Sequence, residues 1–270
     1  MAATTHRPTR IIRKKRRALL SRYDEDDLHR LRVELRRIRS ILKRQTGGKA
    51  RRLRRDLGDI ADATSAARDW DTLRARASRD IDQHTFRLLE PELERRRRHA
   101  HKRALRVLQA GKSSSVLKKV DRFLVAHTRS GNSHNSRKAV DRAIAGVADA
   151  ENKAVAAQTP AKWHKLRIAI KELHYTLDTG AGPSSVPHYA AMLAQCKRLQ
   201  FLLGQWHDTE VHRQTVQALL TSLDPKLSSQ VSGPLLAWSR SLESEGRACL
   251  EEARTGLGPV TQGITGAGHD

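Results

Sequence analysis

The sequence predicts an all-α fold made of two helical halves. No segment of the 270-residue chain alternates apolar and polar residues over the length of a strand, whereas apolar residues recur at three- and four-residue steps. Segments 28–43 and 163–178 repeat one pattern of apolar and basic residues, and a similar succession of segments follows each. Long helices with short loops indicate antiparallel bundles. Two related halves are most economically arranged about a pseudo-twofold axis, which would bring both repeated helices to a shared basic groove.

The first half begins after a basic stretch. Residues 1–22 are predicted to be a polyanion-binding arm, helical from about Thr9; they lack the apolar core and cleavage site of a secretory signal. The acidic run 23–27 suits a helix N-terminus, with Asp24 as N-cap, and Gly47-Gly48 ends that helix. The rest of this half reads as three segments: one long helix or two in line over 49–82, a helix with four consecutive arginines over 83–110, and a shorter helix to about 127.

The polar, glycine-containing stretch 130–136 is predicted to link the halves, which therefore span about 23–129 and 137–257 of one domain. The second half is expected to contain five features in order: a helix over 137–158, the second repeated helix from Pro160, a loop over 180–185, a helix from 186 that Gly204 interrupts or bends and that continues in register over 211–223, and a last helix over 227–257. Residues 258–270 have no pattern and are predicted to be a disordered tail.

Each repeated helix carries a basic stripe one position beyond its apolar stripe, which is about 100° further round the helix. We call these two basic stripes ladders. The candidate ligands are His29, Arg32, Arg36, Arg39 and Lys43 on the first ladder, and His164, Arg167, Lys171 and His174 on the second. Basic side chains beside a core stripe commonly cover apolar surface and keep their charges in water. The same order recurs here in the same register, however, which solubility does not require and ligand binding does.

Charge points to the kind of partner. The chain has 52 Lys and Arg against 29 Asp and Glu, a formal net charge of +23, and so strong an imbalance favours a polyanionic partner. Guanidinium groups bind phosphate oxygens through paired N–H donors, and lysine adds a point charge. Aromatic residues make up only 4% of the chain, which argues against proteins that stack single-stranded bases.

Other chemistry lacks a signature in the sequence. Two cysteines without a CxxC pair indicate neither a disulfide framework nor a zinc site, and favour a reducing, cytoplasmic compartment. There is no run of 18 apolar residues for a membrane span, no HExxH metal motif, no GxSxG elbow and no Walker loop. We therefore expect a binding protein without metal, cofactor or catalytic residues, and with no membrane partner.

Several segments together resemble the CHAD domain (conserved histidine α-helical domain) family. HRLRVELRRIR and HKLRIAIKELHY are similar to its two signature helices, and the segments 68–71 and 199–208 resemble its RDxD and LQxxLGxxxD motifs. The resemblance covers roughly residues 23–255. It implies two helical bundles with pseudo-twofold symmetry around a basic groove, binding of inorganic polyphosphate, and association with polyphosphate granules.

Carried over by position, the resemblance supports the ladder residues and adds Lys197 and Arg198 from a later helix, with Arg51, Arg52 and Arg55 as looser counterparts in the first half. Two positions depart from the family pattern. His174 stands where an arginine is common, which would make binding sensitive to pH, and Ser65 stands where the second half has Gly204. Relatives fused to a CYTH triphosphatase carry an ExExK strand, which this sequence lacks, so hydrolysis is not implied.

Two alternatives to polyphosphate binding stay open. The same charge would bind nucleic acid nonspecifically by releasing counterions, although no helix-turn-helix or zinc finger is evident. An enzyme acting on polyphosphate would need an acidic metal cluster or a nucleotide loop, and neither is apparent.

Overall fold

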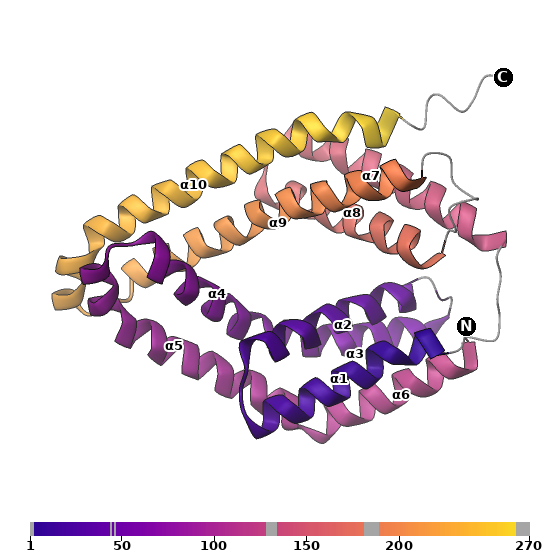
Figure 1. The fold of residues 1–270 in the computed structure, drawn as a ribbon, viewed down its shortest axis with the longest axis horizontal. Coiled ribbons are helices and arrows are strands. Elements are labelled where there is room, and N and C mark those ends of the chain that lie inside the picture. Colours follow the sequence, from indigo (N-terminus) through magenta and orange to yellow (C-terminus); the bar gives the residue numbers. More distant parts are fainter. Residues whose placement is uncertain (1–2, 44, 46, 128–133, 181–188, 263–270) are drawn as a thin grey trace. The chain divides into compact units, whose positions relative to one another are not determined.

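The all-α prediction is confirmed in a computed structural model (Figure 1). It describes the whole chain except residues 1–2, 44, 46, 128–133, 181–188 and 263–270. For residues 3–7, 127, 134–137, 179–180 and 258–262 it describes the backbone but not the side chains. Those described parts contain no strand. Their helices are α1 (Ala3–Ser21), α2 (Glu25–Lys43), α3 (Gly48–Ala63), α4 (Ser65–Asp80), α5 (Gln83–Gln109), α6 (Gly111–His127), α7 (His134–Ala157), α8 (Pro160–Gly180), α9 (Tyr189–Leu220) and α10 (Pro225–Gln262).

The chain divides into two compact units. Unit 1 contains residues 1–131 and 224–234, and unit 2 contains residues 132–223 and 235–270. The first turns of α10 therefore belong to the same unit as the first half of the sequence, whereas the predicted boundaries placed all of α10 in the second half. The predicted linker 130–136 lies mostly outside the described residues, and α7 begins within it at His134. The pseudo-twofold relation and the shared groove stay predictions, because each unit is described by itself.

Helix α1 is part of the core of unit 1, so the prediction of a separate basic arm over residues 1–22 is wrong. Thr9, Ile12 and Leu19 are at most 1% exposed and lie on one side of the helix. The helix packs against α2, α5 and α6. Its cations are also engaged within the unit: Arg16 donates from Nε to the Leu108 carbonyl at 2.5 Å.

Local backbone chemistry sets the ends of the helices around the first ladder. Gly47 has a φ of 104°, a left-handed conformation that favours glycine, and it lies between α2 and α3 as the sequence predicted. The region 49–82 forms two helices, because the helical conformation is interrupted at Thr64. There the Thr64 hydroxyl donates to the Ala61 carbonyl at 2.9 Å and closes the end of α3.

Two predicted helix limits are wrong in unit 2. Gly204 does not interrupt α9, which is continuous from Tyr189 to Leu220. A helical glycine costs only about 1 kcal/mol relative to alanine, and burial of Leu203 and Trp206 on either side outweighs that cost. Helix α10 continues to Gln262, so residues 258–262 are helical and not part of a tail; 263–270 lie outside the described residues.

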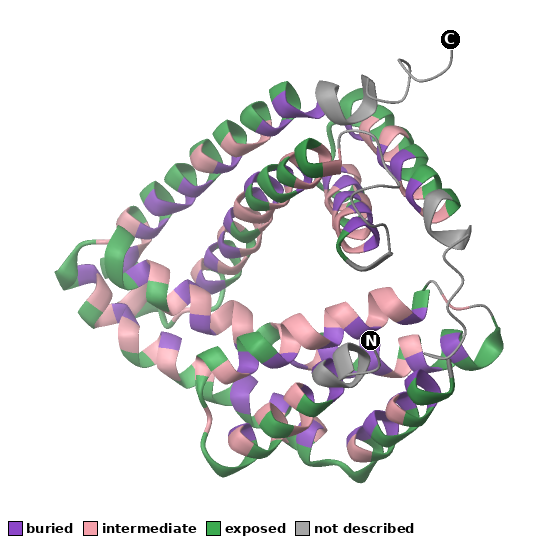
Figure 2. Cartoon of the chain, turned by 45° about the vertical axis from the view of Figure 1, so that its right-hand side comes forward, coloured by how far each residue is buried: buried purple, intermediate pink, exposed green. Residues whose placement is uncertain are grey.

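The two apolar stripes lie in the cores of their units, as predicted. In unit 1 the residues of α2 that point inward are at most 1% exposed: Leu28, Leu31, Leu35, Ile38 and Leu42. In unit 2 the residues of α8 are at most 3% exposed: Trp163, Leu166, Ile170, Leu173 and Leu177. Figure 2 shows the resulting division of the helices into a buried and an exposed side. Each buried leucine contributes roughly 1.5–3 kcal/mol, so these stripes fix the orientation of both ladder helices.

Candidate polyanion-binding surfaces

In unit 1 the ladder of α2 faces the junction of α3 and α4 in an antiparallel register. Arg39 lies against Gly58, Arg32 reaches Ser65, and the charge of Arg68 acts on His29. Residue numbers rise along α2 while those of its partners fall. This register fixes which side chains of α3 and α4 join the ladder.

Arg32 is bound within the fold. Its Nη1 lies 2.5 Å from the Ala61 carbonyl, 3.0 Å from the Thr64 hydroxyl and 3.1 Å from the Ser65 hydroxyl. It therefore satisfies acceptors at the end of α3, where helical carbonyls lack intrahelical partners. Burial and the nearby charge of Arg36 lower the pKa of Arg32. Arg32 thus positions α3 against α2, and this role was missed by the sequence pattern.

Arg39 packs on the backbone of α3. A Cβ at Gly58 would lie 3.4 Å from its Nη2 and 3.5 Å from its Cζ, so the glycine leaves room for the guanidinium to lie close. Arg36 is half-buried on the same stripe, and no hydrogen bond joins it to another residue in the described ranges. Lys43 continues the stripe and is exposed.

His29 and Arg68 form the other end of this surface. Burial lowers the pKa of His29, and the charges of Arg68 and Arg36 lower it further. Arg68 belongs to the motif at 68–71 but was not among the candidate ligands. Its signal in the sequence was the match between Arg68-Asp69 and His207-Asp208, each about forty residues after a ladder histidine.

The three arginines proposed on α3 do not share one face. Arg51 and Arg55 are exposed and lie on the same side of the helix as Gly58, which Arg39 contacts. Arg52 lies about 100° further round, on the side of Asp56. That side faces a different feature, a cavity of about 380 Å³ that α3 forms with α5 and α6.

In unit 2 the ladder of α8 faces α9 in the equivalent antiparallel register. The His164 and His207 rings lie 4.9 Å apart between centroids, with an angle of 46° between their planes. Burial lowers the pKa of His207 to about 4, and the charges of Arg167, His164 and Lys171 contribute to that shift. Burial, Arg167 and Lys171 lower the pKa of His164 in the same direction. His207, like Arg68 in unit 1, was absent from the predicted ligands.

At the other end of this ladder, His174 lies near Lys197. Burial and the charge of Lys197 lower the pKa of His174, and Asp178 opposes the shift. Neighbouring Arg198 points elsewhere: its Nη2 lies 3.1 Å from Glu252 of α10. Of the two residues carried over from the family pattern, Lys197 therefore joins the ladder, whereas Arg198 pairs on another side of α9.

Comparison of the registers changes the predicted correspondence between the units. Lys197 faces His174 in unit 2, and the residue that faces Arg39 in unit 1 is Gly58. The position equivalent to Lys197 is thus Gly58, and Arg51, Arg52 and Arg55 are not its counterparts.

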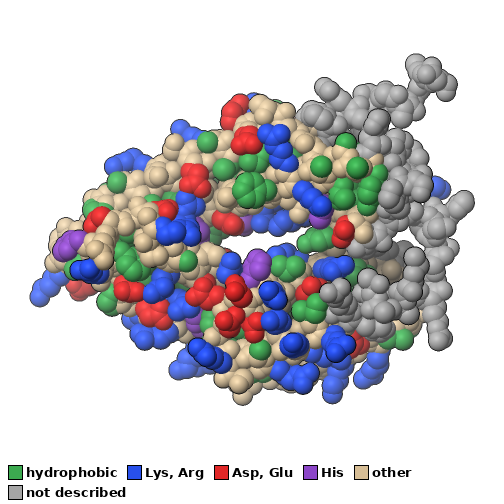
Figure 3. Space-filling model, viewed as in Figure 1, with side chains coloured by type: hydrophobic (Ala, Val, Ile, Leu, Met, Phe, Trp, Pro, Cys, Tyr) green, Lys and Arg blue, Asp and Glu red, His purple; other side chains and the backbone are tan. Residues whose placement is uncertain are grey.

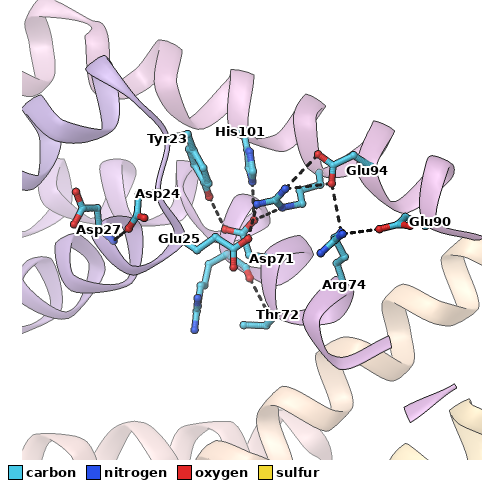
Figure 4. A network of polar contacts seen from close by, with 12 residues as sticks. Tyr23, Asp24, Glu25, Asp27, Asp71, Thr72, Arg74, Glu90, Glu94 and His101 are labelled. Atoms are coloured by element: carbon cyan, nitrogen blue, oxygen red, sulfur yellow. Dashed lines mark hydrogen bonds and ion pairs between the residues drawn. The ribbon is translucent and has the colours of Figure 1, made fainter. Parts of the chain in front are cut away.

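Asp71 of the 68–71 motif lies in the interior of unit 1 and does not pair with a ladder arginine. Figure 4 shows it between Tyr23 and His101. It accepts from Tyr23 Oη at 2.5 Å, from His101 Nε2 at 2.7 Å and from Arg97 Nε at 2.8 Å. Burial alone would raise the pKa of Asp71, but the three hydrogen bonds outweigh it and lower the pKa. Arg97, from the run of four arginines, thus has a structural role.

The described residues provide little for other chemistry. They hold no group of three His, Cys, Asp or Glu side chains arranged to bind a metal ion. None of the described helices combines the length and apolar character that crossing a bilayer requires.

Comparisons with known proteins agree with this architecture. The sequence model of the CHAD domain family matches residues 7–217, which include most of α1 and both ladders. The crystal structure of the CHAD domain from the plant Ricinus communis is similar, with a TM-score of 0.77 and 22% sequence identity over 95% of this chain and 89% of that one. At that identity the likeness establishes the fold alone. No curated protein matches the chain.

Proposed function

This chain belongs to the CHAD domain family, which is associated with polyphosphate binding, and from that premise we propose that it binds inorganic polyphosphate without hydrolysing it. The ligand surfaces are the ladder of α2 with Arg68 and the ladder of α8 with His207 and Lys197. In a cell that stores polyphosphate, such binding would bring the protein to the granules.

The observation that carries this proposal is the gathering of like charges on one side of α8. Arg167, Lys171 and His164 all depress the protonation of His207. Glu210, an acid that raises the pKa of His207, is itself bound by Arg213 at 2.9 Å. Groups of one sign held close together repel each other, and an anion placed among them removes that cost.

The length of each ladder suits a polymer better than a single phosphate. An α-helix rises 1.5 Å per residue, so His29 and Arg39, or His164 and His174, are about 15 Å apart along their helices. A single phosphate would meet only one turn of such a surface. A linear polyphosphate presents anionic oxygens along its whole length, and cations held on a rigid helix bind it at a lower entropic cost.

Nonspecific binding of nucleic acid is the second candidate. The observation that favours it is the wide distribution of charge: on the face in Figure 3, Lys and Arg side chains are spread over the surface and are not confined to one patch. Such a surface would bind any polyanion, with an affinity that falls steeply as salt rises.

Calorimetric titration tests the two candidates. Long-chain polyphosphate and duplex DNA are titrated into the protein at near-physiological salt and equal phosphate concentration. We expect submicromolar affinity for polyphosphate and much weaker binding of DNA. Equal affinities that fall together as salt rises would reject a shaped polyphosphate site in favour of nonspecific binding.

A matched pair of variants tests the ladders themselves. Arg36→Ala with Lys171→Ala removes one ladder charge from each unit, and Arg122→Ala with Arg240→Ala removes one exposed charge from each unit elsewhere. A charge-assisted hydrogen bond contributes about 1.5–3 kcal/mol, so the ladder variant should lose at least about tenfold in affinity. The control should lose less than about threefold, and an equal loss in both would refute the assignment to the ladders.

The non-catalytic part of the proposal has its own readout. Purified protein incubated with polyphosphate and magnesium should release no orthophosphate above background. Release that depends on the protein would overturn it.

A further inference from the structure

The two units carry different kinds of cation at equivalent positions. At one end of the ladder, unit 1 has Arg68 beside His29, and unit 2 has His207 beside His164. At the other end, unit 1 has Arg39 on the ladder helix, where unit 2 has His174. Two fixed charges of unit 1 are thus replaced in unit 2 by imidazoles, whose charge depends on pH.

We propose that unit 2 is a proton-linked anion site, in which a polyanion binds together with protons taken up by His164, His207 and His174, whereas unit 1 binds mainly through fixed charge. The proposal rests on the function proposed above, because its ligand is the same polyanion. It adds that the affinity of one of the two surfaces is set by pH.

The imidazole pair supplies the geometry. With ring centroids 4.9 Å apart, His164 and His207 are near enough to repel each other when both are charged. An anionic oxygen placed between the rings would offset this repulsion and favour the protonated form, since each protonated ring could donate a hydrogen bond to it. Arg167 and Lys171 act on the same pair, so the anion would be held by four cationic groups.

His174 offers a second point of contact. Both of its ring nitrogens are shielded from solvent, and within the described part of the chain neither has a hydrogen-bond partner. A shielded polar atom without a partner costs free energy, which a bound anion would recover by accepting a hydrogen bond from the ring. Lys197 lies on the opposing helix and supplies a fixed charge at this end.

The direction of the pH effect follows from the charged groups around each ring. Arg167 and Lys171 act on His164; both of these and Glu210 act on His207; Asp178 and Lys197 act on His174. Burial and the cations outweigh the two acids, so the pKa of each ring is lowered and the neutral form of each ring is favoured in the free protein. A bound polyanion favours the charged form and raises each pKa. Affinity should therefore rise as pH falls from 8 toward 6, with protons taken up on binding.

Calorimetry measures this coupling directly. Long-chain polyphosphate, whose internal phosphates stay ionised, is titrated into the full chain at pH 6.5 in two buffers that differ in ionisation enthalpy. The difference in heat gives the number of protons taken up. We expect an uptake of at least one proton and an affinity that increases about tenfold per pH unit for each proton fully taken up.

Variants assign the protons to unit 2. His164→Asn with His207→Asn should flatten the pH dependence, whereas His84→Asn with His99→Asn, two exposed histidines of α5, should leave it unchanged. The single variant His207→Arg places the residue of unit 1 at this position and should bind more tightly at pH 8 with a shallower slope. It serves as the second test if the double variant does not fold.

The outcomes separate this inference from the proposed function. Binding of polyphosphate without proton uptake overturns the inference and leaves the function standing, as does uptake that only His29→Asn removes. Absence of binding at every pH between 5.5 and 8 overturns both.

Discussion

Replacing Asp71 with alanine should destabilise unit 1 strongly without touching either ladder. The Asp71 side chain is fully buried, and three donors converge on it: Tyr23 from the loop before α2, and Arg97 and His101 from α5. Alanine would leave those donors in an interior from which water is excluded, where an unsatisfied polar group costs about 1–3 kcal/mol.

The magnitude depends on which donors have another partner. Arg97 also pairs with Glu25 and with Glu94, so it keeps a counter-charge. Tyr23 and His101, which stack at 3.6 Å between ring centroids, are left without the acceptor that they share. Two unsatisfied donors with one weakened ion pair give a loss of about 3 kcal/mol, at the lower end of the cost of breaking a buried ion pair.

Urea unfolding followed by tryptophan fluorescence measures this loss in the full chain. Trp70 is the one tryptophan within unit 1, and it packs against the core of that unit. With an m value of about 2 kcal/mol/M, the midpoint of the unit 1 transition should fall by roughly 1.5 M. Asp26→Ala, which removes an exposed carboxylate nearby on α2, should cost less than about 0.5 kcal/mol.

Acid provides a further check on the mechanism. Because the pKa of Asp71 in the folded protein lies below its ordinary value, its stabilising contribution is complete above that ordinary value and is lost as pH falls toward the folded pKa. The difference in stability between wild type and Asp71→Ala should be constant from pH 5 to 8 and narrow below about pH 4. A midpoint shift no larger than that of Asp26→Ala, or a difference that grows in acid, would refute the reasoning.

Three further predictions concern other side chains. Arg32→Ala removes three contacts at the end of α3 and should cost about 1–3 kcal/mol in urea unfolding, a loss that a residue serving only as a ligand would not show. Gly58→Ala places a methyl group in ordinary contact with the Arg39 guanidinium and should leave thermal stability unchanged or raised, through the helix propensity of alanine; a lower Tm would show that Arg39 cannot yield. Burial raises the pKa of the Cys196 thiol to about 12, so mass spectrometry should find that iodoacetamide modifies half-exposed Cys249 well before Cys196 in the folded protein.

Sequence periodicity was sufficient for the fold class and for most of the helices because it reports which side of a helix is buried. The predicted start of α8 at Pro160 and the span of α5 from Gln83 follow the structure closely, since proline and a capping aspartate mark helix starts chemically. Gly204 misled the prediction because a glycine weakens a helix locally, whereas the packing that overrides it depends on contacts distant in sequence. The basic stretch of α1 misled it for a related reason, since charge masked the apolar residues on its inner side.

The ladders could be predicted as stripes, but the use of each cation could not. Periodicity places Arg32 and Arg36 on the same side of α2, yet only the break at Thr64, on a different helix, determines that Arg32 caps α3. In the same way, adjacent Lys197 and Arg198 look equivalent in sequence, and the 100° between them directs one toward α8 and the other toward α10. The partner that each basic side chain contacts is determined by the register between packed helices, which the sequence pattern of one helix does not specify.

That register also explains how two units with the same pattern can differ in chemistry. When Arg39 is exchanged for a histidine, the charge lost from the ladder helix is restored on the opposing helix, where Gly58 of unit 1 becomes Lys197 of unit 2. No such compensation accompanies the exchange of Arg68 for His207, because the partner is a histidine in both units. The number of fixed charges is therefore kept where His174 replaces Arg39, and it falls by one where His207 replaces Arg68. We accordingly expect His207 to contribute most to the dependence of binding on pH.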